Sequence, residues 1–126
     1  MSRIIAACVM AVLVVASCIA GQTTVAGCDK KISSFIDQAR DAVMQEDFAN
    51  AQQAAEKAEE TFVNCETKLE LFVNHRLVEE VGMELSKLPS LAKEDTCQEF
   101  LAELESARVM MIHIVRDNRA TLLNVL

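Results

Sequence analysis

Two histidines and five cysteines are the residues of this chain whose side chains suit metal or covalent chemistry. A helical zinc site needs histidines four residues apart with further ligands nearby, whereas His75 and His113 are isolated from each other. If the two segments that carry them pack antiparallel, the midpoint between them falls on Glu94, in the loop expected to join these segments. We therefore expect His75 and His113 to lie close together without binding a transition metal. The ordinary role of such a histidine is a half-buried side chain paired with a carboxylate such as Glu79.

Cys28 and Cys65 are candidates for a disulfide. If the first helical hairpin turns between Glu46 and Asp47, the two cysteines are level across it, because each is 18 residues from the turn (46 minus 28 and 65 minus 47). Export would permit oxidation, and closing a loop of 65 minus 28, or 37, residues typically stabilises a fold by roughly 2 to 4 kcal/mol. In a reducing environment the domain cysteines would instead be small buried core residues. Cys97 has no level partner and is expected to stay free.

No residue set in the sequence predicts an enzyme. The glutamates cluster in runs typical of solvated helix faces, and no neighbouring group would remove two carboxylates from water together. Ser33 and Ser34 have no activating base nearby in the sequence. We therefore expect neither catalytic activity nor a cofactor.

The charge balance argues against nucleic acid as a partner. Nineteen acidic residues exceed twelve basic ones and give a net charge of −7, whereas phosphate backbones attract basic patches. The sequence has no Trp or Tyr, the residues that most often stack on unpaired bases. Anionic lipid surfaces attract clustered Lys or Arg, of which Lys30 and Lys31 are a poor version.

Residues 1–21 are predicted to be an export signal or a membrane anchor. Arg3 precedes an uncharged, mostly apolar run of 18 residues, from Ile4 to Gly21. This length lies between that of a secretory signal and the roughly 20 residues that span a bilayer. Three outcomes compete: an uncleaved anchor, lipidation of Cys18 after the lipobox-like Val15-Ala16-Ser17, and cleavage after residue 20 or 21. Arg3 predicts that the N-terminus stays inside, so that the rest of the chain faces the extracytoplasmic side.

Residues 22–27 are predicted to be a short polar tether, and residues 28–126 to form one helical domain. With only three glycines and one proline, the chain favours helices joined by short loops. From Ile32 onwards apolar residues recur on one helical face until Gln45, and Asp47 is expected to cap a second helix. The apolar spacing shifts its phase at Asn74-His75, so the second helix either carries a stutter or breaks there.

The second half of the chain is predicted to end in one well-defined helix. Pro89 is expected to finish the preceding element, and a loop from Pro89 to Asp95 to follow it. Thr96 and Glu99 form a capping-box pattern, in which each side chain satisfies a free backbone N–H. The last helix should run to about Asn118, before an apolar tail at 122–126. Together these elements predict an all-α fold, an antiparallel three- or four-helix bundle of helical hairpins preceded by the apolar N-terminal helix.

Short motifs along the chain resemble two known helical families. The hairpin Glu46-Asp47-Phe48-Ala49-Asn50-Ala51, with the Ala-rich helix after it, looks like a tetratricopeptide unit, although the pattern does not return after about 34 residues. A wider set of motifs resembles the uncharacterised domain-of-unknown-function family 4363 of clostridia and related bacteria. This set comprises the apolar start, the Glu-Asp-Phe turn, Phe72-Val73-Asn74-His75, Leu101-Ala102-Glu103-Leu104, His113-Ile114 and Leu122-Leu123-Asn124-Val125-Leu126. The resemblance implies a small membrane-anchored helical protein with no assigned activity.

These observations lead to two functional hypotheses. The first is a non-enzymatic interaction or scaffold module, held at the cell membrane by its anchor or lipid, with the helical domain on the extracytoplasmic side and another protein as its partner. Simple cleavage of the leader would make this module a secreted one. The second hypothesis is a small sensor or metal-handling domain that uses His75 and His113. Convergence of these histidines with a carboxylate or sulfur ligand would favour the second hypothesis.

Overall fold

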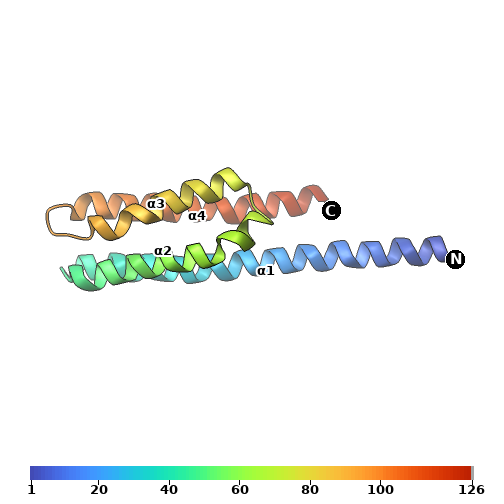
Figure 1. The fold of residues 1–126 in the computed structure, drawn as a ribbon, viewed down its shortest axis with the longest axis horizontal. Coiled ribbons are helices and arrows are strands. Elements are labelled where there is room, and N and C mark those ends of the chain that lie inside the picture. The colour runs from blue at the N-terminus through green and yellow to red at the C-terminus, as the bar shows by residue number, and fades with distance from the viewer. Residues whose placement is uncertain (126) are drawn as a thin grey trace.

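Four helices make up the structure, a computed structural model that describes the backbone of residues 1–125 and, except at 121, 122 and 125, their side chains. Figure 1 shows them in chain order as α1 (Ser2–Met44), α2 (Phe48–Glu70), α3 (His75–Leu91) and α4 (Cys97–Val125). The predicted all-α fold is confirmed, and of the two sizes expected for the bundle, three or four helices, the structure has four, with the apolar segment as part of the first.

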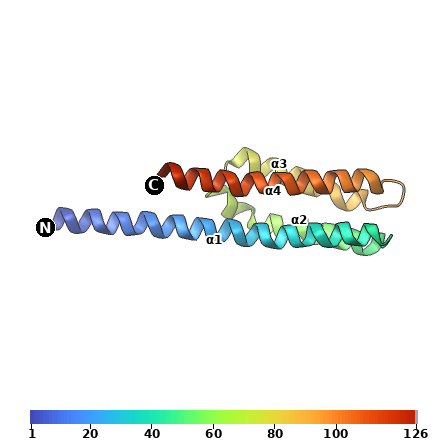
Figure 2. The same ribbon diagram turned by 180° about the vertical axis from the view of Figure 1, so that it is seen from behind.

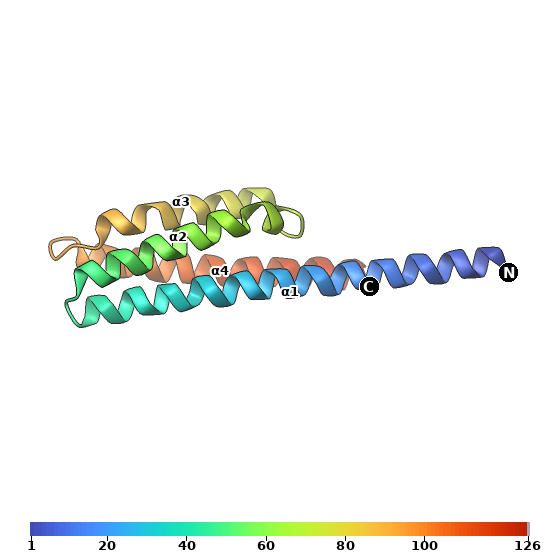
Figure 3. The same cartoon turned by 60° about the horizontal axis from the view of Figure 1, so that its bottom comes forward.

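The helices form an antiparallel bundle in which each one packs against two others. Helices α1 and α3 both contact α2 and α4. Consecutive helices run in opposite directions, as the views from the front and from behind both show (Figures 1 and 2). The N-terminal part of α1 projects beyond the bundle, and α4 reaches past the α2–α3 turn toward it (Figure 3).

A single hydrophobic cluster runs along the axis of the bundle. Alanines let α1 and α2 approach closely, whereas large side chains such as Phe62 and Phe100, both fully buried, fill the space among the helices. Burying one such side chain is worth about 1.5 to 3 kcal/mol, so tertiary packing rather than helix propensity holds these helices in place. The contribution of α1 is a stripe at spacings of three and four residues: Gly21, Val25, Cys28, Ile32, Ile36, Ala39 and Val43.

The predicted tether at 22–27 is wrong, because these residues are helical and belong to α1 without a break. Val25 is 1% exposed and is part of the core. Gly21 lies directly under the ring of Phe72, so closely that a Cβ atom at residue 21 would be 2.7 Å from Cδ1 of that ring. Packing of Gly21 and Val25 onto the bundle therefore keeps the segment helical, and the packed domain begins near Gly21 rather than at Cys28.

The α1–α2 turn has the geometry of a Schellman motif. Glu46 has φ of 59°, its N–H donates to the carbonyl of Val43, and the N–H of Asp47 donates to the carbonyl of Ala42. These bonds satisfy carbonyl groups that the end of α1 would otherwise leave free. As predicted, Asp47 caps α2, because its carboxylate accepts the backbone N–H of Asn50 at 3.2 Å.

The phase shift at Asn74-His75 is a break between two helices. Helix α2 ends at Glu70, and the side chain of Asn74 caps α3 by accepting the backbone N–H of Arg76 at 2.9 Å. The backbone N–H of Asn74 donates to Oδ2 of Asp117 at 3.2 Å, which joins this turn to α4. The two alternatives for this segment are thus decided in favour of separate helices.

The boundaries of the last two helices differ from the prediction. Pro89 lies inside the last turn of α3, so the loop covers 92–96 rather than starting at Pro89. In place of the expected cap, the Thr96 hydroxyl donates to the carbonyl of Leu91 at 2.7 Å and thereby satisfies the end of α3. Helix α4 continues past Asn118 to Val125, so most of the predicted tail is helical and its final residue, Leu126, lies outside the described residues.

Candidate functional site: a membrane-anchoring helix

The N-terminal part of α1 presents apolar side chains in every direction. Nine of them have 39 to 69% of their surface exposed: Ile4, Ile5, Val9, Met10, Val12, Leu13, Val14, Val15 and Ile19. A soluble protein would hide such a helix, since continuous apolar surfaces of this kind mark contacts with a membrane or a partner. Its polar groups are already satisfied within the helix, because the Ser17 hydroxyl donates to the carbonyl of Leu13 at 2.9 Å. A helix that keeps its hydrogen bonds internal suits a hydrocarbon environment.

The length of this apolar segment matches a bilayer. At a rise of about 1.5 Å per residue, the 18 residues from Ile4 to Gly21 extend over about 27 Å, close to the roughly 30 Å of a hydrocarbon core. Among the described residues, α1 is the one helix long and apolar enough to cross a membrane. An N-terminal signal sequence meets the same criteria, so α1 contains either a membrane anchor or a signal sequence.

Cys18 lies at the junction between the apolar part of α1 and the bundle. Its side chain is partly exposed and carries a free thiol, as does the exposed Cys8. Gly21, the first buried residue of the α1 stripe, follows it by less than one helical turn. A lipid attached to Cys18 would therefore enter the membrane beside the start of the packed domain.

A disulfide joins α1 to α2 just beyond this junction. Cys28 and Cys65 are bonded, and their Cα atoms are 6.3 Å apart. This is the pair that the register of the first hairpin predicts, and the Cα distance lies in the range typical of disulfides. Cys97 is free.

Asp29 follows the disulfide and has a perturbed acidity. Burial raises the pKa of its carboxyl group above the ordinary value of 3.8, while a hydrogen bond from the Ser33 hydroxyl, at 3.2 Å, acts in the opposite direction. The raised pKa means that the fold disfavours the negative charge at this position.

The histidines lie in different surroundings. His75 Nδ1 is 3.0 Å from Glu70 Oε1, and its Nε2 is 3.0 Å from Glu79 Oε1. The expected pairing with Glu79 is present. The His75 side chain is 65% exposed rather than half-buried, because it lies on the solvent side of the α2–α3 turn. His113 is exposed and lies in a groove beside Glu80 on the opposite edge of α3.

The register of α3 and α4 gives the relative level of the two histidines. The bond between Asn74 and Asp117 makes the turn of His75 level with Asp117, and His113 precedes Asp117 by about one helical turn on α4. Among the described residues, no group of three or more His, Cys, Asp or Glu side chains is arranged to hold a metal ion. The two histidines therefore do not share a ligand set there.

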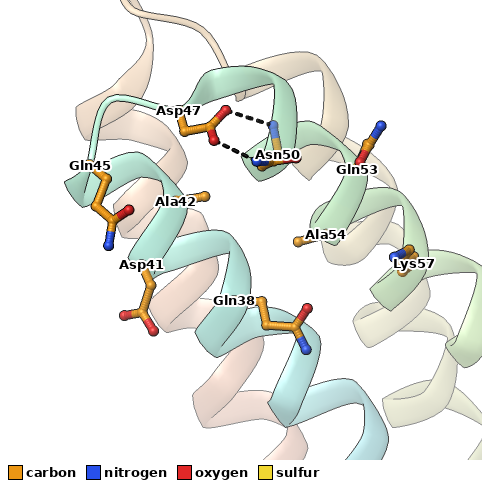
Figure 4. Close-up of a pocket in the computed structure, with 9 residues that line it drawn as sticks. All are labelled: Gln38, Asp41, Ala42, Gln45, Asp47, Asn50, Gln53, Ala54 and Lys57. Carbon is orange, nitrogen blue, oxygen red and sulfur yellow. Dashed lines mark hydrogen bonds between the residues drawn. The ribbon is translucent and has the colours of Figure 1, made fainter.

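A polar hollow of about 320 Å³ lies at the end of the bundle farthest from the apolar segment (Figure 4). Figure 4 shows that Asp47, one of its two acidic side chains, points to Asn50, with which it makes the hydrogen bonds of the α2 cap. That carboxylate is thus used in holding the turn. The lining is otherwise amides, small residues and two charged groups: Gln38, Asp41, Ala42, Gln45, Asn50, Gln53, Ala54 and Lys57. This composition offers hydrogen bonds but no general acid or nucleophile in a dry environment.

Two shallow grooves lie between neighbouring helices of the bundle, one between α2 and α3 and one between α3 and α4. The α2–α3 groove, of about 470 Å³, includes Gly82, whose lack of a side chain leaves room for the buried ring of Phe62. Val63 and Met83 on its sides are 58% and 61% exposed. The α3–α4 groove, of about 530 Å³, is lined by Leu77, Glu80, Ala102, Glu105, Ser106, Val109, Met110 and His113. Both grooves have an apolar floor and glutamates at their edges. Because the glutamates would repel a small anionic substrate, the grooves are better suited to a segment of another protein.

The end of the bundle beside the apolar segment carries side chains that the sequence reading missed. Leu71 and Leu123 are 75% and 76% exposed there, and Arg116 and Arg119 are exposed on the last turns of α4. Arg76, whose side chain is 87% exposed and pairs with Glu80 at 3.3 Å, follows the α2–α3 turn. Their sequence positions are scattered, and only the continuation of α4 past Asn118 places the last of them beside α1.

The fold and the apolar helix together define a class of protein, a small antiparallel four-helix bundle whose first helix continues into an anchor-like or signal-like segment. The chain belongs to the family described as Domain of unknown function (DUF4363), whose model matches residues 19–125. This confirms the resemblance seen in the sequence motifs. No curated protein and no solved structure matches the chain.

Proposed function

We propose that the protein is a non-enzymatic interaction module, held at the extracytoplasmic face of the cell membrane by the N-terminal part of α1, and that its bundle binds another protein. The observation that carries this proposal is the double character of α1. Its first part exposes apolar side chains all round, and its second part is a buried stripe of the bundle. One continuous helix would thus link the membrane to the folded domain.

Two features support the extracytoplasmic side. Arg3 precedes the apolar segment, and positive charge favours retention of that end in the cytoplasm. The disulfide between Cys28 and Cys65 suits an oxidising compartment, whereas cytosolic thiols are usually kept reduced.

The surface of the bundle supports binding rather than catalysis. The α2–α3 groove has the exposed apolar side chains of Val63 and Met83 on its sides, which suit contact with a segment of a partner protein. The alternative role of His75 and His113 in sensing or metal handling lacks a supporting ligand set among the described residues.

Fractionation tests the tether. Membranes washed with alkaline carbonate should retain the protein, and recovery of the protein only in the soluble extracytoplasmic fraction would mean simple cleavage and a secreted module. Cys18→Ser then separates the two tethered forms. A lipoprotein should lose a metabolic fatty-acid label in Cys18→Ser but not in the matched Cys8→Ser variant, whereas a helical anchor should carry no label in either.

A pull-down from detergent-solubilised membranes tests the interaction. The partner should be recovered with the wild type and with Met44→Glu, whose position is 71% exposed at the far end of the bundle. It should be lost when Val63 and Met83 are both replaced by Glu, because charge in the groove opposes apolar contact. Equal recovery with all three proteins would contradict the assignment of the partner to this groove.

A further inference from the structure

The last turns of α4 lie beside the apolar part of α1, at the level where an anchor would enter the membrane. Two contacts of the turn at 71–74 define this level: Phe72 packs over Gly21, and the backbone N–H of Asn74 donates to Asp117. From Asp117 to Val125, α4 continues for 125 minus 117, or eight, residues, which is about 12 Å of helix. Figures 1 and 3 show this end running past the α2–α3 turn toward the N-terminus of α1.

The chemistry of this end differs from that of the rest of the chain. The protein carries a net charge of −7, yet no acidic residue follows Asp117 in the sequence. Arg116 and Arg119 are exposed there, and Leu123 is 76% exposed although it is apolar. Arginines followed by an exposed leucine form an order that matches a membrane interface, where phosphates lie outside the acyl chains.

We propose that the end of α4 lies in the membrane interface next to α1, with Arg116 and Arg119 at the lipid phosphates and Leu123 at the boundary of the acyl chains. This inference rests on the proposed anchoring by α1. The lipid bilayer is the occupant because the surface is continuous with the anchor-like segment and carries the charge opposite to that of anionic headgroups. The bundle would then be held at two points rather than swinging on one helix.

Tryptophan fluorescence gives a direct test, because the sequence contains no Trp. Leu123→Trp would carry the single Trp of the full-length chain, and Met44→Trp, at a position 71% exposed at the opposite end, is the matched control. Both proteins are reconstituted into vesicles of phosphatidylcholine and phosphatidylglycerol, with or without lipids brominated near the headgroup end of the acyl chains. Emission from Leu123→Trp should be blue-shifted and quenched by the brominated lipids, and that from Met44→Trp should be neither.

Two results would overturn the proposal. Unquenched emission from Leu123→Trp in protein that still floats with the vesicles would place the end of α4 in water. A blue shift without quenching would place it against a second copy of the chain. Failure of both proteins to float with vesicles would instead refute the anchoring by α1, so the two proposals fail in distinguishable ways.

The arginines are tested in the Leu123→Trp protein. Replacing Arg116 and Arg119 by Glu should reduce the quenching in anionic vesicles, because the added negative charge is repelled by the phosphates. Lys93→Glu, in the loop at the far end of the bundle, should leave the quenching unchanged. Equal quenching in all three proteins would show that the two arginines do not contact the lipid phosphates.

Discussion

Cys28 and Cys65 link α1, the helix with the apolar N-terminal segment, to α2, which follows it. Cys28 is 6% exposed within the α1 stripe, and Cys65 packs at the edge of the core. A link at this point closes a loop of 37 residues, which includes the α1–α2 turn and the parts of both helices next to it. The disulfide therefore restricts the unfolded chain between residues 28 and 65, which hold the α1–α2 turn.

Replacing Cys28 by Ser should expose one additional free thiol, at Cys65, when the unfolded and unreduced protein is titrated. The variant should also unfold at lower denaturant concentration in mild detergent, because the loss of a disulfide of this span typically costs roughly 2 to 4 kcal/mol. Cys97→Ser is the control, since it removes a free cysteine and should lower the thiol count by one without a comparable loss of stability. An unchanged thiol count in Cys28→Ser would mean that the bond never forms.

Asp29 gives the fold a dependence on pH. Because burial raises the pKa of this carboxyl group in the folded state, the folded protein binds the proton more tightly than the unfolded chain. The contribution of this proton to the free energy of unfolding is fully present below the ordinary pKa of 3.8. It is lost as the pH rises through the raised pKa of the folded state. Asp29→Asn should therefore be more stable than the wild type at pH 7, and this advantage should vanish as the pH falls toward the ordinary pKa.

Urea unfolding at a series of pH values measures this difference, with Asp41→Asn, an exposed position on the same helix, as the control. A loss of stability in Asp29→Asn at pH 7 would show that the hydrogen bond from Ser33 outweighs the burial of the charge.

At the scale of the helices, local signals in the sequence predicted most of the ends, and tertiary contacts decided the others. Asp47 is a cap by residue type, so it could be placed from sequence alone. The composition of the segment at 22–27 resembles that of a linker, but the segment is part of α1. It packs through Val25 and beside the contact of Gly21 with Phe72, 51 residues away (72 minus 21), which the local sequence does not reveal. The extension of α4 has the same origin, since its side-by-side packing with α1 is not a local property.

The α1–α2 turn holds a non-glycine residue in the left-handed region, at Glu46. A Cβ atom in this conformation costs about 1 kcal/mol, and glycine avoids that cost. Glu46→Gly should therefore raise the free energy of unfolding by up to about 1 kcal/mol. Glu46→Ala keeps the Cβ atom and removes the carboxylate, so it should show no such gain in urea titrations. An equal gain in both variants would attribute the effect to charge instead of the backbone.

Gly21 and Gly27 form a matched pair within α1. A Cβ atom at Gly27 meets nothing within 4 Å, whereas one at Gly21 would be 2.7 Å from the Phe72 ring. Alanine is favoured over glycine in helices by up to about 1 kcal/mol, so Gly27→Ala should raise the thermal midpoint in detergent. Gly21→Ala should lower it through steric conflict, and Phe72→Leu in the same protein should restore part of the loss. An equal rise of the thermal midpoint in both alanine variants would mean that residue 21 is not packed against the bundle.

In the whole molecule, α1 has an exposed apolar N-terminal part and a C-terminal part that is packed in the bundle. Because the helix is unbroken between these two parts, the bundle directly continues the apolar segment. In the proposed anchoring, the α2–α3 turn and the end of α4 face the bilayer, while the α1–α2 turn and the loop at 92–96 lie farthest from it (Figure 3). The α2–α3 and α3–α4 grooves would then run roughly parallel to the membrane normal. A partner in the α2–α3 groove would then be another protein of the same membrane, with a segment that extends from the bilayer into the groove.

This orientation makes a prediction for intact cells. Cys97 is free and partly exposed at the start of α4, at the end of the bundle away from the apolar segment, whereas Cys8 lies within that segment. In a Cys18→Ser background, which removes the free thiol at the junction, a membrane-impermeant maleimide should therefore label Cys97 without permeabilisation. Adding Cys97→Ser should abolish this label, while adding Cys8→Ser should keep it. Met44→Cys, in the Cys97→Ser protein, places a thiol at a position that is 71% exposed at the same end and should restore strong labelling. If both thiols react only after the cells are permeabilised, the bundle lies in the cytoplasm, and the proposed outward orientation is wrong.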